Sequence, residues 1–130
     1  MALAHVTLAT RELARSTAFF HEVLGRTPIG RPRNNAAPAA WLQIAPGQEL
    51  HLVEVPEFQP SPFEQEYGRH IALSLPRPGF PTLKERLIAH GAEVTEPLRD
   101  TPFDRFFFRD SNGYLFEVLE QERGAENLVS

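Results

Sequence analysis

The sequence contains no cysteine among its 130 residues, which excludes disulfide bonds, thiolate metal sites and cysteine nucleophiles. It has no apolar run near the roughly 18 residues that cross a bilayer. Its N-terminus also lacks the basic and apolar regions of a signal peptide. We therefore expect no membrane partner, and the cytoplasm is the expected compartment.

Basic residues are too few and too scattered to indicate a nucleic-acid partner. The chain has 13 lysines and arginines against 17 aspartates and glutamates, which gives a net charge of -4, whereas nucleic-acid-binding domains carry clustered positive charge. Hydrophobic residues make up 42% of the chain and charged residues 23%, as is ordinary for a globular protein. The length suits one domain with a real core.

The chain does contain one order of predicted elements that occurs twice. In the first half, the strand "LAHVTLA" is followed by a helix over 13–24, which ends at Gly25. A short edge strand at 26–30 and the strands "AAWLQIA" and "ELHLVEV" come next. The second half repeats this order with "HIALSL", a helix beginning near Pro81, "AEVTEP", "DRFFFRD" and "YLFEVLE".

Matching residues in the two halves lie about 66 positions apart. The matched pairs are His5 with His70, Gly25 with Gly91, Gly47 with Gly113, and His51 with Glu117. This agreement indicates an internal duplication. The predicted fold class is α+β, with two βαβββ modules forming a cupped mixed sheet with the helices outside. The modules are expected at 1–55 and 68–122, the linker at 56–67 and a C-terminal tail at 123–130.

The matched histidines and carboxylate indicate a metal site. His5 and His70 stand at the start of the first strand of each half, and His51 and Glu117 stand on the last strands. If the modules pack about a pseudo-twofold axis, these side chains can converge. Imidazole and carboxylate suit Zn, Ni, Fe, Co or Mn equally. Two histidines and one carboxylate also describe the facial triad of non-haem iron oxygenases.

Four segments carry a family resemblance: "HVTLATRELARSTAFFHEVLG", "ELHLVEV", "GRHIALSL" and "RDSNGYLFEVLE". In this order and spacing they resemble the vicinal oxygen chelate superfamily, which includes glyoxalase I, fosfomycin-resistance proteins, bleomycin-resistance proteins and extradiol dioxygenases. The resemblance implies a cup around one divalent metal ion, with His5, His70 and Glu117 as ligands and His51 at the fourth ligand position. Glyoxalase I usually has a glutamate where this chain has His51, and that glutamate also takes part in proton transfer.

The resemblance implies a glyoxalase-I-like isomerase or lyase that acts on a small molecule, with Glu117 as the remaining catalytic base. Two alternatives stay open: an Fe(II) extradiol-type dioxygenase, and a metal-free ligand-binding protein of the bleomycin-resistance type. Thr7 shares a strand face with His5, and we expect Thr7, Trp41 and Phe108 to contact the substrate. A homodimer is expected, because family members with one pair of modules commonly dimerise.

Overall fold

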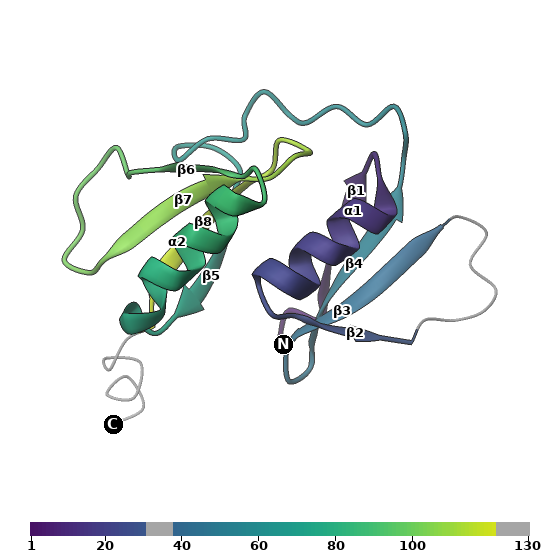
Figure 1. Cartoon of the computed structure of the whole chain (residues 1–130), viewed down its shortest axis with the longest axis horizontal. Coiled ribbons are helices and arrows are strands. Elements are labelled where there is room, and N and C mark those ends of the chain that lie inside the picture. Colours follow the sequence, from purple (N-terminus) through teal and green to yellow (C-terminus); the bar gives the residue numbers. More distant parts are fainter. Residues whose placement is uncertain (31–37, 122–130) are drawn as a thin grey trace. The chain divides into compact units, whose positions relative to one another are not determined.

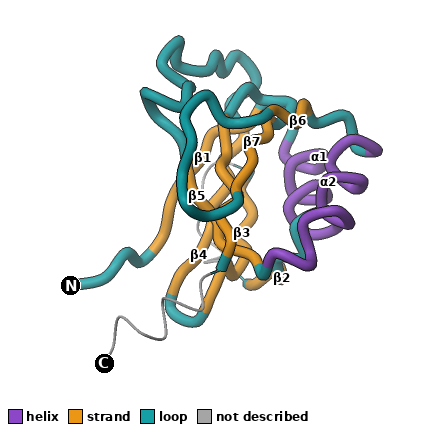
Figure 2. Tube along the Cα trace, turned by 90° about the vertical axis from the view of Figure 1, so that its left-hand side faces the viewer, coloured by secondary structure: helices purple, strands orange, loops and turns teal. Residues whose placement is uncertain are grey.

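The computed structural model describes residues 1–30 and 38–121, which divide into two compact units between Gln59 and Pro60. Each unit contains a four-stranded sheet with a helix against it (Figures 1 and 2). The predicted loop at 31–38, apart from Pro38, and the predicted tail at 123–130 lie outside the described residues. Among the residues described, no helix is both long enough and apolar enough to span a bilayer.

The first unit has the predicted order of one strand, one helix and three strands. Its elements are β1 (His5–Thr10), α1 (Leu13–Ala18), the π-helical turn η1 (Phe19–Val23), β2 (Thr27–Ile29), β3 (Ala39–Ala45) and β4 (Gln48–Glu54). The sheet order is β1-β4-β3-β2, in which β1 runs parallel to β4 and the other pairs are antiparallel. The predicted single helix is therefore present as α1 with η1 as its last turn.

The second unit repeats this order. Its elements are β5 (Ile71–Leu75), the 3-10 turn η2 (Arg77–Gly79), α2 (Phe80–Ala89), β6 (Glu93–Thr95), β7 (Arg105–Arg109) and β8 (Leu115–Glu120). The sheet order β5-β8-β7-β6 matches that of the first unit, again with one parallel pair, β5 and β8. The predicted α+β class is confirmed, and the arrangement is consistent with duplicated βαβββ modules.

Strand register places His51 and Glu117 at equivalent positions in the two sheets. Each has equivalent partners on the first and third strands of its unit: Thr7 and Trp41 for His51, and Ala72 and Phe107 for Glu117. The positive backbone φ angles fall at equivalent glycines too: Gly25 and Gly91 after the helices, and Gly47 and Gly113 in the last hairpin turns. The duplication seen in the sequence thus extends to the hydrogen-bonding register.

Aromatic residues on alternate positions of β7 fill the core of the second unit. Phe106 meets Phe80 of α2 edge to face, with ring centroids 5.2 Å apart, and Phe108 stacks on Phe116 at 4.9 Å. Because side chains alternate along a strand, Phe107 points to the opposite face of the sheet. The core side of this sheet is therefore the face that carries Phe106 and Phe108.

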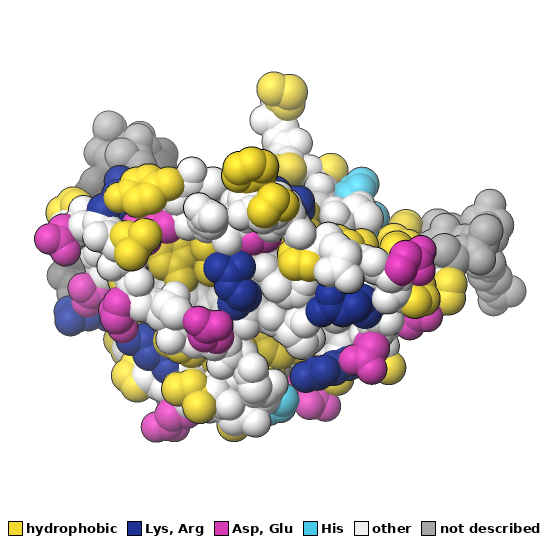
Figure 3. Space-filling model, turned by 90° about the horizontal axis from the view of Figure 1, so that it is seen from above, with side chains coloured by type: hydrophobic (Ala, Val, Ile, Leu, Met, Phe, Trp, Pro, Cys, Tyr) yellow, Lys and Arg dark blue, Asp and Glu magenta, His cyan; other side chains and the backbone are white. Residues whose placement is uncertain are grey.

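Some large apolar side chains remain exposed. Ile88 of α2 is 63% exposed, whereas Phe80 and Leu87 of the same helix are buried. Phe63, Tyr67 and Leu98 are exposed as well. Figure 3 shows apolar side chains scattered among acidic and basic ones on one face of the molecule.

The two hairpin-turn glycines allow a matched test of the fold. Alanine at either position meets backbone strain on the order of 1–2 kcal/mol, because φ is positive. At Gly113 an added Cβ would also lie 2.7 Å from Cγ of Pro60, whereas nothing lies within 4 Å at Gly47. We expect Gly113→Ala to lower the free energy of unfolding by about 1 kcal/mol more than Gly47→Ala, measured by urea denaturation followed by circular dichroism. Equal losses would show that Pro60 is not fixed against this turn.

Candidate functional site

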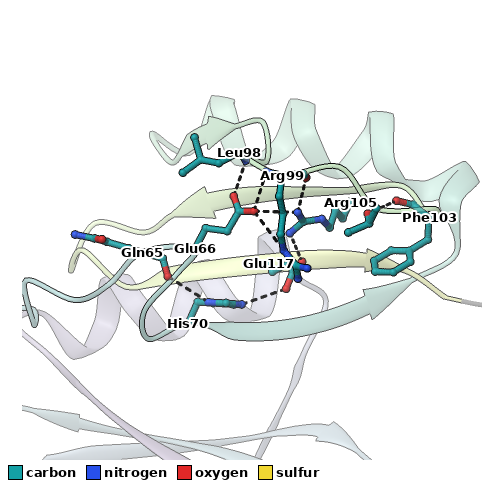
Figure 4. Close-up of polar contacts among 9 residues, drawn as sticks. Gln65, Glu66, His70, Leu98, Arg99, Phe103, Arg105 and Glu117 are labelled. Atoms are coloured by element: carbon teal, nitrogen blue, oxygen red, sulfur yellow. Dashed lines mark hydrogen bonds and ion pairs between the residues drawn. The ribbon is translucent and has the colours of Figure 1, made fainter.

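His70 and Glu117 form the centre of a polar cluster in the second unit (Figure 4). His70 directly precedes β5, and Glu117 lies within β8, the parallel neighbour of β5. The Nε2 atom of His70 lies 3.2 Å from Oε1 of Glu117. The Glu117 side chain is only 9% exposed, so this pairing takes place largely away from water.

The second ring nitrogen of His70 is also engaged. Its Nδ1 lies 3.3 Å from the carbonyl oxygen of Gln65, so both nitrogens face oxygen acceptors. A neutral imidazole carries only one N–H. The arrangement is therefore satisfied by a doubly protonated ring, or by a neutral ring that donates from Nδ1 while a cation lies near Nε2 and the carboxylate. Histidines that bind metals commonly have their second nitrogen held by a carbonyl in this way.

The spacing of these two atoms fits two ligands of one ion. Zinc binds histidine nitrogen and carboxylate oxygen at about 2.0–2.2 Å. Two such atoms are about 3.0 Å apart when they subtend a right angle at the ion, and about 3.4 Å apart at the tetrahedral angle. The observed 3.2 Å between Nε2 of His70 and Oε1 of Glu117 lies between these values. This half of the predicted ligand set therefore fits a divalent metal.

Arg105 holds the second oxygen of Glu117. Its Nη1 donates to Oε2 of Glu117 at 2.8 Å, and its Nη2 donates to Oε2 of Glu66 at 2.9 Å and to the carbonyl oxygen of Arg99 at 2.7 Å. Its side chain is 2% exposed. Burial would lower the pKa of Arg105, but the hydrogen bonds and charges of the two carboxylates raise the pKa above its usual value. A fixed positive charge therefore lies beside Glu117.

Glu66, which lies in the loop before β5, connects this cluster to the loop that contains Leu98 and Arg99. Its carboxylate accepts hydrogen bonds from the backbone N–H of Leu98 at 2.6 Å and of Arg99 at 3.2 Å, in addition to the bond from Arg105. Burial alone would raise the pKa of Glu66, but these three hydrogen bonds outweigh it and leave the pKa below its usual value. Glu66 is thus held as a carboxylate that anchors the far side of the Arg105 guanidinium.

Both oxygens of Glu117 are engaged in this cluster, one by His70 and one by Arg105. A catalytic base needs an oxygen that can reach the substrate proton, so this arrangement favours a ligand role for Glu117. Its catalytic role stays a prediction.

Phe107 lies on the same face of the sheet as Glu117, and its ring meets that of His70 edge to face at 5.5 Å. Phe108 is fully buried in the core on the other face, which does not favour its predicted contact with substrate.

In the first unit, His51 lies in a stack of three rings. Its ring centroid is 4.1 Å from that of His5 and 4.0 Å from that of Trp41, with the planes 16° and 5° from parallel. His51 also donates from Nε2 to Oε1 of Glu49 at 2.8 Å. His5 and Thr7 of β1 are exposed. The orientation of the His51 ring is therefore fixed by stacking on both of its faces and by the hydrogen bond from Nε2.

The parallel stack restricts how these histidines could bind metal. An imidazole nitrogen offers its lone pair in the plane of the ring, so two nearly parallel rings direct their lone pairs along separate planes. One ring has to turn before His5 and His51 could bind the same ion. The ligand role of His51 stays a prediction. Within residues 1–30 and 38–121, no three histidine or carboxylate side chains gather into one ready set of metal ligands.

The comparisons with known proteins agree with this architecture. A family model described as the Glyoxalase/Bleomycin resistance protein/Dioxygenase superfamily matches residues 2–118. The chain belongs to this superfamily. The resemblance predicted from the four sequence segments is confirmed.

This superfamily member is similar to one named plant protein and to several solved structures. A protein of Arabidopsis thaliana named Glyoxylase I 4 is 28% identical over 122 residues, which cover 89% of this chain and 68% of the relative. The fosfomycin resistance protein FosX from Listeria monocytogenes, complexed in a mutant form with Mn(II) and 1S,2S-dihydroxypropylphosphonic acid, has a TM-score of 0.76 at 22% identity and covers 99% and 98% of the two chains. A glyoxylase/bleomycin resistance protein/dioxygenase domain from Frankia sp. EAN1pec has a TM-score of 0.74 at 25% identity, covering 94% and 98%.

Three polar residues of this superfamily member were missed in the sequence. Strand alternation places Arg105 on the same face as Phe107, but only the register of β7 against β8 shows that this face also carries Glu117. Glu49 stands two residues before His51, on the same face of β4. Glu66 lies in a loop, and no periodic pattern could have assigned it a partner.

The stack on His51 can be tested with the single tryptophan of the chain, Trp41. His51→Ala should shift the fluorescence emission of Trp41 to longer wavelength, because the indole loses a stacked neighbour and meets more water. It should also lower the free energy of unfolding by about 1 kcal/mol, since aromatic pairs contribute roughly 0.5–1.5 kcal/mol. His21→Ala is the control, because His21 is exposed and bonds to the Arg26 carbonyl. Identical spectra for both variants and the wild type would contradict the stack.

Proposed function

We propose that this chain is a metal-dependent enzyme that binds one divalent ion through His5, His70 and Glu117 and acts on a small molecule with two neighbouring oxygens. The observation that supports it best is the pair formed by His70 and Glu117. Their ligand atoms lie 3.2 Å apart at a largely buried position. The second nitrogen of His70 is held by a carbonyl oxygen, as in many metal-binding histidines.

The residues of the second unit would then have separate roles. His70 would supply a neutral ligand whose ring orientation is set by Gln65, and Glu117 would supply the anionic ligand through Oε1. The buried ring of Phe107 lies edge to face against His70 and would shield that side of the ligand from water. The bound ion would polarise two neighbouring oxygens of the substrate and stabilise negative charge that develops on them.

A glyoxalase-I-like isomerase or lyase is the first candidate, supported by the name of the Arabidopsis relative. An Fe(II) dioxygenase is the second. It is favoured by the stacking of His51, which leaves two histidines and one carboxylate as the simplest ligand set. A homodimer remains part of the proposal, with the pairing of modules within one chain or between two left open.

Metal analysis of the purified protein tests the proposal directly. We expect one divalent ion per chain in the wild type, and loss of most of it in His5→Ala and His70→Ala. Metal at about 1,000 times its dissociation constant should stabilise the folded protein by about 4 kcal/mol, seen as a higher melting temperature. Iron in the purified protein, together with oxygen uptake on adding a catechol, would support the dioxygenase candidate over the isomerase or lyase.

His21→Ala is the matched control for this experiment, because it also removes one imidazole but lies on the exposed side of η1. It should keep the metal content and the melting temperature of the wild type. If His70→Ala retained full metal content, or if the wild type took up no divalent ion, the proposed site would be wrong.

Turnover of the methylglyoxal–glutathione adduct tests the role of His51. We expect weak or absent wild-type turnover, because His51 has no carboxylate to move the substrate proton and its ring is fixed by stacking and by Glu49. His51→Glu should raise the rate, whereas His51→Gln, which offers no base, should not. A wild-type kcat/KM of about 10⁶ M⁻¹s⁻¹ or more would show that His51 is no obstacle.

A further inference from the structure

We infer that Arg105 is a positioning residue that holds Glu117 so that only its Oε1 is directed toward His70, which makes Glu117 a one-oxygen metal ligand. This inference rests on the proposed metal site and deepens it. It assigns a role to a buried cation that the proposed chemistry does not otherwise use.

The guanidinium of Arg105 is fixed from three segments of the chain. Nη1 bonds to Oε2 of Glu117 on β8, and Nη2 bonds to the carboxylate of Glu66 and to the carbonyl of Arg99. Its plane also lies close to the ring of Phe107, with 5.4 Å between the guanidinium carbon and the ring centroid. A side chain that is 2% exposed and held at this many points has little freedom to follow a moving carboxylate.

The consequence for Glu117 follows from its two oxygens. A free carboxylate can bind a cation with one oxygen or with both. Here Oε2 is already taken by a charge-assisted hydrogen bond, which is among the stronger polar contacts in proteins. Only Oε1 is left on the side of His70. Arg105 therefore restricts both the direction and the number of oxygens that Glu117 offers.

Arg105→Lys separates the positioning role of Arg105 from the effect of its charge. It keeps a positive charge but lacks the planar fork that reaches Glu117 and Glu66 together. Arg109→Lys is the matched control on the same strand, because Arg109 bonds to the backbone carbonyls of Gly113 and Glu64 rather than to Glu117. Each variant is titrated with Co²⁺, and the visible absorption spectrum reports both affinity and coordination.

We expect Arg105→Lys to bind Co²⁺ about 10- to 100-fold more weakly, the usual effect of losing a residue that orients a ligand. Its absorption bands should also change, because Glu117 becomes free to use both oxygens. Arg109→Lys should match the wild type. In a Glu117→Gln background, Arg105→Lys should cause no further loss, because Arg105 acts through the carboxylate of Glu117.

Any one of the following results would overturn the inference. Arg105→Lys could show the wild-type affinity and spectrum, or its loss could be the same with and without the Glu117 carboxylate, as a purely structural role predicts. If the wild type bound no Co²⁺, the proposed function would fail together with this inference. Should Arg105→Lys not fold, Glu66→Ala removes the anchor of the guanidinium instead. Changed Co²⁺ bands in Glu66→Ala support the positioning role, and unchanged bands refute it.

Discussion

The buried carboxylate of Glu117 is the feature on which the polar architecture of the second unit depends. Removing a carboxylate from water costs several kcal/mol unless partners compensate its charge. Arg105 compensates the charge through Oε2, and Oε1 lies 3.2 Å from Nε2 of His70. Arg105 is buried in turn and requires Glu66, whose own hydrogen bonds fix the loop at Leu98. The polar contacts around one buried charge thus link strands β7 and β8 to the loops of Glu66 and Leu98.

The two units share one strand order and register but carry different side chains at equivalent positions. At equivalent places in the register, the first unit has His51 against the ring of Trp41, and the second has Glu117 opposite Phe107. The His51 ring is stacked between two rings and bonds to one carboxylate, that of Glu49. The Glu117 carboxylate instead contacts the Arg105 guanidinium and the His70 ring. At equivalent positions, the first unit therefore carries stacked aromatic rings and the second carries a cluster of ion pairs.

The duplicated fold could be predicted because its signals are local. Strand alternation and the turn glycines, such as Gly113 with its φ of 95°, act within a few residues of sequence. The ion-pair cluster could not be predicted, because the pairing of Arg105 with Glu117 requires the register of β7 against β8 and a loop that brings in Glu66. The same dependence explains why the sequence pointed to Phe108 when Phe107 shares the face of Glu117: a shift of one residue along a strand changes the face.

X-ray absorption spectroscopy of the zinc-loaded protein shows directly whether histidine and carboxylate together hold a divalent ion. We expect a first shell of nitrogen and oxygen at about 2.0–2.1 Å, with the outer-shell scattering of two imidazole rings. In His70→Ala measured with excess zinc, the zinc that is still bound should lack the contribution of one ring. A shell of oxygen alone without imidazole scattering, or a spectrum that His70→Ala leaves unchanged, would contradict the proposed metal site.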